Sequence, residues 1–75
     1  MRINVNYMGT EVVVYVLVGY NQATIYYYKG YCMDDKPVVT FEFFDAAMFY
    51  SKETAEEVGM VAKLKVEEHV YYVKN

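Results

Sequence analysis

The chain has 75 residues, of which 56% are hydrophobic and 19% aromatic, with ten Tyr and no Trp. This length predicts one domain over residues 1–75, which buries only about 60–65% of the surface that its unfolded chain exposes. Seven basic and ten acidic side chains give a net charge of −3, which argues against general nucleic-acid binding because that binding relies on an excess of Lys and Arg.

The first half of the chain predicts three β-strands. Residues 3–7 alternate apolar and polar side chains, as a half-buried strand does. Residues 12–18 read VVVYVLV, a β-branched run that is apolar on both faces and favours a central or covered strand. After a turn predicted over residues 19–23, the segment Thr24–Tyr28 reads TIYYY and predicts a third strand, which Gly30 ends or interrupts with a bulge.

The second half predicts a loop, two further strands and a helix. Residues 33–37 are polar and contain the only proline, so we expect a loop there, followed by a fourth strand over residues 38–44. Ser51 is a suitable N-cap for a helix of about 11 residues, because its hydroxyl accepts from a free N–H of the first turn. Residues 64–73 predict a last strand, whose alternation changes phase at Glu67–Glu68 and suggests a bulge or a break.

The predicted helix has a narrow apolar stripe and an acidic outer surface. Ala55, Val58 and Ala62 are spaced as one helical face. Gly59 lies inside this pattern and costs about 1 kcal/mol relative to alanine, so we expect it to permit close approach to the sheet or to mark a shorter helix. Three carboxylates fall outside the stripe: Glu53, Glu56 and Glu57.

The element order β-β-β-β-α-β predicts an α+β fold of two layers, with one antiparallel sheet of about five strands and one helix on one face. A helix of about 11 residues is about 16 Å long and covers only the middle of that face. We expect Ile25 and Tyr27 to point toward the helix. The opposite face is then uncovered, and we assign to it Val13, Tyr15, Leu17, Tyr26 and Tyr28, with Tyr71 and Val73 as further candidates.

A large uncovered apolar face rich in tyrosine is typical of an interface, because Tyr contributes contact area while its hydroxyl keeps the free protein soluble. The sequence therefore predicts that another chain covers Tyr15, Leu17, Tyr26 and Tyr28, either a second copy or a foreign protein. A plainer alternative stays open. Tyrosine also has high β-propensity, and a small sheet that curls buries both rows of side chains on itself.

The sequence contains no pattern that predicts catalysis or a cofactor. Cys32 and His69 are residue types found in nucleophile–base pairs, and Asp34–Asp35 adds carboxylates that bind cations, but nothing in the spacing brings these segments together. We therefore expect a non-enzymatic protein with no metal and no cofactor. Aromatic side chains on a sheet also stack nucleic-acid bases, but such platforms are rimmed by Lys and Arg, and only Lys29 lies in the tyrosine segment.

The chain is expected to act in the cytoplasm. Its one cysteine excludes an internal disulfide and fits a reducing compartment. The opening residues, MRINVNYM, alternate rather than form an apolar run, so we expect no secretory signal. The apolar run over residues 12–18 is far too short to cross a bilayer.

The segment FFDAAMFYSKETAEEVG reads as a strand end, a D-A-x-x-F motif and a Ser-capped helix that begins S-K-E-x-A-E-E-V. Over about residues 41–73 the chain resembles small accessory proteins encoded by bacteriophages and mobile elements, a group that includes anti-CRISPR proteins. The resemblance implies a genomic context rather than a mechanism. Many proteins of this group are accessory factors, and some, including anti-CRISPR proteins, inhibit host defence by binding. The resemblance carries over no catalytic residue, because the group shares none.

Together these observations predict a protein-binding module that inhibits a host defence or nucleic-acid-handling protein by steric occlusion. Its expected partner has a basic surface, which Glu53, Glu56 and Glu57 would meet, because opposite charge speeds encounter. A solvated helix face is the plainer interpretation of those glutamates. Two alternative functions stay open: a structural homodimer without an inhibitory role, and a module that holds a small nucleotide-like ligand at a dimer seam.

Overall fold

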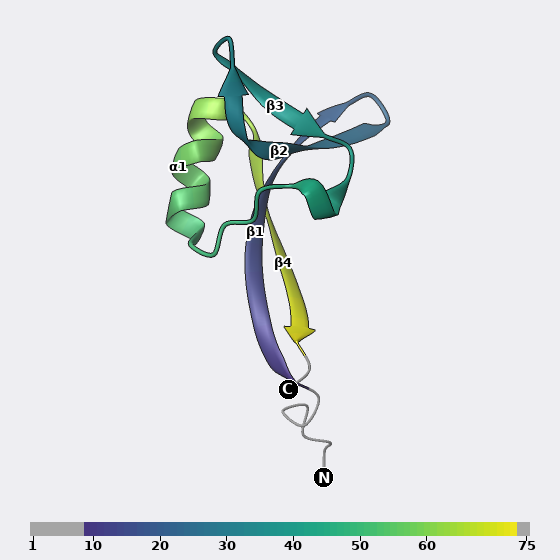
Figure 1. The fold of residues 1–75 in the computed structure, drawn as a ribbon, viewed down its shortest axis with the longest axis vertical. Coiled ribbons are helices and arrows are strands. Elements are labelled where there is room, and N and C mark those ends of the chain that lie inside the picture. Colours follow the sequence, from purple (N-terminus) through teal and green to yellow (C-terminus); the bar gives the residue numbers. More distant parts are fainter. Residues whose placement is uncertain (1–8, 74–75) are drawn as a thin grey trace.

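A computed structural model of the chain describes residues 9–73 and has an α+β fold. One four-stranded antiparallel sheet in the order β3-β2-β1-β4 carries one α-helix (Figure 1). The elements are β1 Thr10–Asn21, β2 Thr24–Met33, β3 Lys36–Thr40, the 3-10 turn η2 Phe43–Asp45, α1 Lys52–Ala62 and β4 Lys65–Val73. The α+β class and the antiparallel sheet are confirmed, whereas the strand predicted over residues 3–7 lies outside the described residues.

Two-residue turns join the first three strands. Gln22–Ala23 connects β1 to β2, so the turn predicted over residues 19–23 is shorter than expected and Gly19 lies inside β1. Asp34–Asp35 connects β2 to β3, and both residues have positive φ angles of 53° and 63°. Two consecutive positive φ angles define the type I′ turn, whose twist matches that of the flanking strands. Aspartate tolerates this conformation better than most residues, which explains the acidic pair.

The bulge predicted at Gly30 is confirmed. Tyr28 pairs with Val39 and Cys32 pairs with Pro37, so three residues of β2 lie opposite one residue of β3. Gly30 sits in the middle of the three at a φ of 112°, a conformation that a side chain strongly disfavours.

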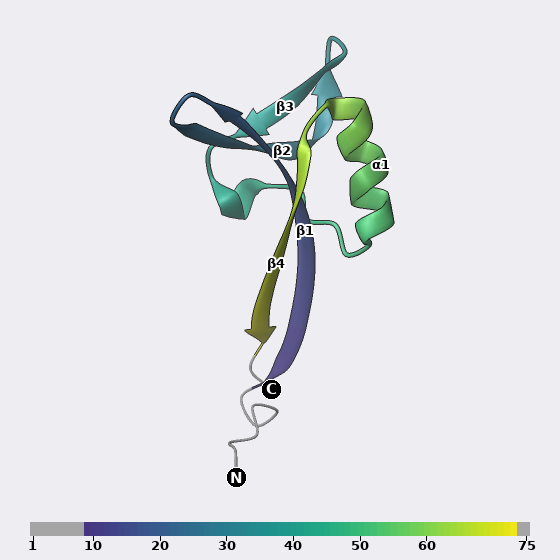
Figure 2. The same ribbon diagram turned by 180° about the vertical axis from the view of Figure 1, so that it is seen from behind.

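The chain crosses the sheet between β1 and β2. These strands pair only from Val18 to Asn21 on the β1 side, and β2 then turns away from β1. The segment 46–49 enters the space that β2 leaves (Figures 1 and 2). Tyr15 and Phe49 exchange two backbone hydrogen bonds of 2.8 Å, and the Ala47 N–H donates to the Tyr28 carbonyl oxygen at 2.9 Å. This segment, called the crossing segment below, therefore replaces β2 as the neighbour of β1.

Because of this crossing, the two faces of β1 are covered by different parts of the chain. On one face, η2 and the residues after it cover a cluster of Val16, Val18 and Ala46, against which Tyr27, Phe43 and Met48 pack. On the other face, α1 covers a cluster of Leu17, Tyr28 and Ala55, against which Tyr15, Ala47, Phe49, Val58, Leu64 and Val66 pack. Ala46 and Ala47 are neighbours in sequence, yet they pack in opposite layers.

The prediction of which sheet face the helix covers is wrong, although the predicted alternation of side chains within each strand is confirmed. Leu17 and Tyr28 were expected on the uncovered face, but they are 0% and 7% exposed and lie beneath α1. Tyr27 was expected under the helix, but it packs on the opposite face. The reason is that the strand predicted over residues 38–44 is too long. The strand ends at Thr40, and the residues after it form η2 and cover the second face.

The bulge predicted at Glu67–Glu68 is also wrong. β4 pairs with β1 without a shift from Lys65 to Val73. The phase change has another cause. The end of the β1–β4 ribbon projects beyond α1 and η2 (Figures 1 and 2). Residues 70–73 of β4 are 41–56% exposed on both faces, so no alternation is required there.

The predicted start of the helix is confirmed, and its end explains Gly59. The Thr54 N–H donates to Ser51 Oγ at 3.2 Å, which caps the first turn. The Leu64 N–H donates to the Gly59 carbonyl oxygen at 2.9 Å, after Lys63 has adopted a left-handed conformation. A methyl group on Gly59 would lie 3.0 Å from the Leu64 carbonyl oxygen and 3.1 Å from Leu17 Cδ2. Glycine therefore lets the helix pack closely on β1 and on Leu64, which follows the end of the helix.

The substitution Gly59→Ala tests this close packing. Alanine is about 1 kcal/mol more favourable than glycine inside an unconstrained helix. We nevertheless expect Gly59→Ala to lower the free energy of unfolding by about 1–2 kcal/mol, because its methyl meets a backbone oxygen that cannot move alone. Urea unfolding measures the change. The control Thr54→Ala, at an exposed position of α1, should keep or raise stability, and a gain in both variants would contradict the packing.

Candidate functional site

The outer surface of α1 combines exposed carboxylates with exposed apolar side chains. Glu53, Glu56 and Glu57 are all exposed, as the sequence predicted. Met60 and Val61 follow them near the C-terminal end of the helix and are 79% and 82% exposed. Met60 and Val61 were not among the binding residues predicted from the sequence. Their position outside the stripe of Ala55, Val58 and Ala62 was nevertheless enough to predict that they are exposed.

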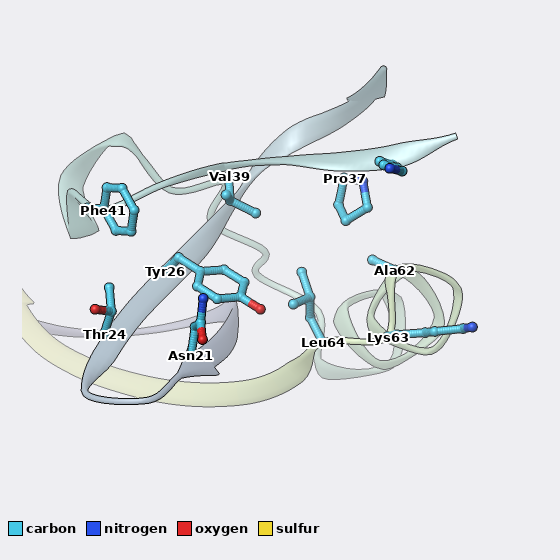
Figure 3. A pocket seen from close by; sticks show the side chains of 10 residues that line it. Asn21, Thr24, Tyr26, Pro37, Val39, Phe41, Ala62, Lys63 and Leu64 are labelled. Atoms are coloured by element: carbon cyan, nitrogen blue, oxygen red, sulfur yellow. The ribbon is translucent and has the colours of Figure 1, made fainter. Parts of the chain in front are cut away.

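A cleft of about 560 Å³ lies near the same end of α1. Figure 3 shows the Tyr26 ring at its centre, with Val39 and Pro37 of β3 on one side and Leu64 facing the Tyr26 hydroxyl. Its lining is mostly apolar and comes from three parts of the chain: Asn21 and Thr24 with Tyr26, Lys36 and Pro37 with Val39 and Phe41, and Ala62 and Lys63 with Leu64. Phe41 is 68% exposed at its rim. We call this the Tyr26 cleft.

The sheet itself places Tyr26 in the cleft. Tyr26 pairs with Gly19 across the β1–β2 hairpin, and its ring occupies the space above that glycine. A Cβ at Gly19 would overlap the Tyr26 ring. The absent side chain therefore leaves room for the ring, which lines the cleft and covers the glycine.

The predicted binding residues do not form one surface. Tyr26 lines the Tyr26 cleft, and the three glutamates lie on the outside of α1. Tyr15 is half-buried in the cluster beneath the helix, where Leu17 and Tyr28 are buried. Leu17 and Tyr28 are therefore core residues of the free chain and offer no surface to a partner, because α1 occupies the face on which they lie.

Cys32 and His69 lie on strands that β1 separates. Cys32 is exposed on β2, whereas His69 is half-buried on β4. The His69 Nε2 atom lies 2.8 Å from Glu67 Oε1, and its ring packs on Phe43 with centroids 4.6 Å apart. Among residues 9–73, His, Cys, Asp and Glu form no group of three or more that is arranged to hold a metal ion.

No protein-family model, curated protein or solved structure matches this chain. Within the described part of the chain, α1 is too short and too polar to cross a membrane, and no other helix there qualifies.

Burial of Tyr28 generates a prediction about alkaline stability. Burial of the ring, and next the nearby Cys32 side chain, raise the pKa of the Tyr28 hydroxyl above its usual value of about 10. A raised folded-state pKa means that the stability contributed by neutral Tyr28 is fully present below about pH 10 and is lost as the pH rises through the folded-state pKa. We expect Tyr28→Phe to lose less stability than the wild type between about pH 9 and pH 11.

Chemical unfolding at several pH values measures this difference. Tyr20→Phe is the matched control, because Tyr20 is 53% exposed and its variant should follow the wild-type pH dependence. Identical curves for Tyr28→Phe and the wild type would show that Tyr28 does not carry the alkaline loss of stability.

Proposed function

We propose that this chain is a non-enzymatic protein-binding module that covers a basic surface of its partner. It acts in the cytoplasm, as a phage-encoded inhibitor of a host defence or nucleic-acid-handling protein, by steric occlusion. The resemblance over residues 41–73 supports the phage setting. The observation that carries the binding role is the outer surface of α1, where three exposed glutamates precede the exposed side chains of Met60 and Val61.

Charge supports a basic partner. The chain has a net charge of −3, and three of its ten carboxylates lie within five residues of α1. Clustered charge on one face steers a partner of opposite charge and suppresses partners of like charge. Proteins that handle nucleic acids carry the required Lys- and Arg-rich surfaces.

Apolar contacts supply the affinity that exposed charges alone do not. Exposed ion pairs contribute little because water and salt screen them. Met60 and Val61 lie beside the acidic row, and the Tyr26 cleft opens near the same end of α1 with Phe41 exposed at its rim. A cleft of this size accepts an aromatic or aliphatic side chain of the partner, in the manner of an interface anchor.

Charge reversal on α1 tests the proposal. We expect Glu56→Lys combined with Glu57→Lys to weaken capture of basic proteins from a bacterial lysate by about tenfold, because two attractive contacts become repulsive. Raising the salt concentration should release the wild-type partner. Quantitative mass spectrometry of the captured proteins, with their isoelectric points, provides the measurement.

The matched control is Glu42→Lys combined with Asp45→Lys. Both residues are exposed, the change in net charge is the same, and Asp45 belongs to η2 on the face opposite α1. Capture should survive in the control. Equal losses of capture in the two variants would show that net charge alone causes the effect. Capture of the same proteins by both variants at the wild-type level would contradict the proposal that the α1 surface binds them.

A further inference from the structure

Within the described residues, β4 has a long edge with which no other strand pairs. Among residues 9–73 the sheet ends at β3 on one side and at β4 on the other. β3 has five residues, including Pro37, so it is a poor template for a further strand. β4 has nine residues, KVEEHVYYV, without proline or glycine. In Figure 1 β1 is the only described element beside its projecting half.

The hydrogen bonds of the crossing segment identify the backbone groups on this free edge. Tyr15 directs its N–H and carbonyl oxygen toward Phe49, so it does not bond to its β4 partner, Glu68. Residues opposite each other in an antiparallel pair alternate between bonded and non-bonded pairs. The backbone groups that point away from β1 therefore belong to Val66, Glu68, Val70 and Tyr72. They span about 20 Å at about 3.4 Å per residue.

We propose that the free edge of β4 binds β4 of a second copy of this chain in antiparallel register, which joins the two sheets into one. The register with His69 on the two-fold axis uses all four open positions. It pairs Val66 with Tyr72 and Glu68 with Val70, each twice by symmetry. A two-fold contact uses the same edge on both chains, so it requires only that this edge is complementary to itself. A foreign strand would have to supply a separate complementary sequence.

Side chains are also compatible in this register. On the α1 face, Glu68 lies opposite Val70 of the second copy, and on the η2 face Glu67 lies opposite Tyr71 of the second copy. No carboxylate meets a carboxylate directly, which would destabilise the pair. The contact also covers apolar side chains that the free chain exposes: Val70 is 46%, Tyr71 41% and Tyr72 56% exposed.

A second cavity adjoins the same edge. A pocket of about 470 Å³ is lined by Phe43, Phe44, Met48, His69, Val70 and Tyr71. Phe44 is 87% exposed there, and its ring lies edge-on to Phe43 at a centroid distance of 5.4 Å. Tyr71 of the second copy enters on the η2 face, next to this pocket, so the contact combines backbone hydrogen bonds with aromatic packing. The surface is distinct from the outside of α1, which remains free in the dimer.

The pairing of Glu68 with Val70 gives a test that is specific to the register. We expect the wild type to dimerise in solution. Val70→Glu places two carboxylates opposite each other at two symmetric positions and should raise the dissociation constant about tenfold or more. Val70→Lys places an ammonium opposite Glu68 and should keep the dimer. Adding Glu68→Lys to Val70→Glu restores opposite charges and should restore dimerisation. Analytical ultracentrifugation over a concentration series measures each constant.

Circular dichroism on each variant checks that it is folded. Val70→Glu and Val70→Lys both replace the same apolar side chain by a charged one, so a difference between their dissociation constants reports on the charge opposite residue 70 rather than on stability. Glu56→Lys with Glu57→Lys should dimerise as the wild type does, because both glutamates are exposed on α1 and neither belongs to β4. A wild type that stays monomeric at every concentration would overturn the proposal. A dimer in which Val70→Glu and Val70→Lys behave alike would overturn it too, because this edge in this register would not be the contact.

Discussion

The structure depends on the passage of the chain between β1 and β2. At this point β1 loses β2 as its neighbour, and its backbone groups would face an apolar interior without partners, which is costly for each group. The crossing segment supplies those partners, through the bonds between Tyr15 and Phe49 and from Ala47 to Tyr28. Ala46 and Ala47 are consecutive in this segment and pack one into each layer.

The crossing sets the position of every candidate surface. Because the chain changes sides there, η2 covers the Val16–Val18 face and α1 covers the Leu17–Tyr28 face. One short helix leaves the end of its face open, where Tyr26 and Phe41 form the Tyr26 cleft. No other described strand pairs with the outer edge of β4, so the proposed self-association uses that edge while the acidic side of α1 stays available to a partner.

Local features of the fold followed from the sequence, and the layering did not. The Ser51 cap, the bulge at Gly30 and the alternation in TIYYY each rest on neighbouring residues, and the structure confirms all three. Alternation states which side chains share a face, but it does not state which element covers that face. The crossing segment is held by backbone hydrogen bonds, which leave no mark in the side-chain pattern, so Phe43 was predicted as part of a strand. Tyr26, Leu17 and Tyr28 were all assigned to a face without a cover. That face belongs to α1, which buries Leu17 and Tyr28 and leaves Tyr26 half-buried in the cleft near its C-terminal end.

Hydrogen exchange at the crossing segment tests this account most directly. If these bonds hold the two layers together, the amide protons of Tyr15, Ala47 and Phe49 exchange only when the whole domain unfolds, with the same opening free energy as Val16 at the centre of β1. If Ala47 and Phe49 exchange readily while β1 and β4 stay protected, the crossing segment opens independently of the sheet. That result would contradict the claim that the layers depend on it.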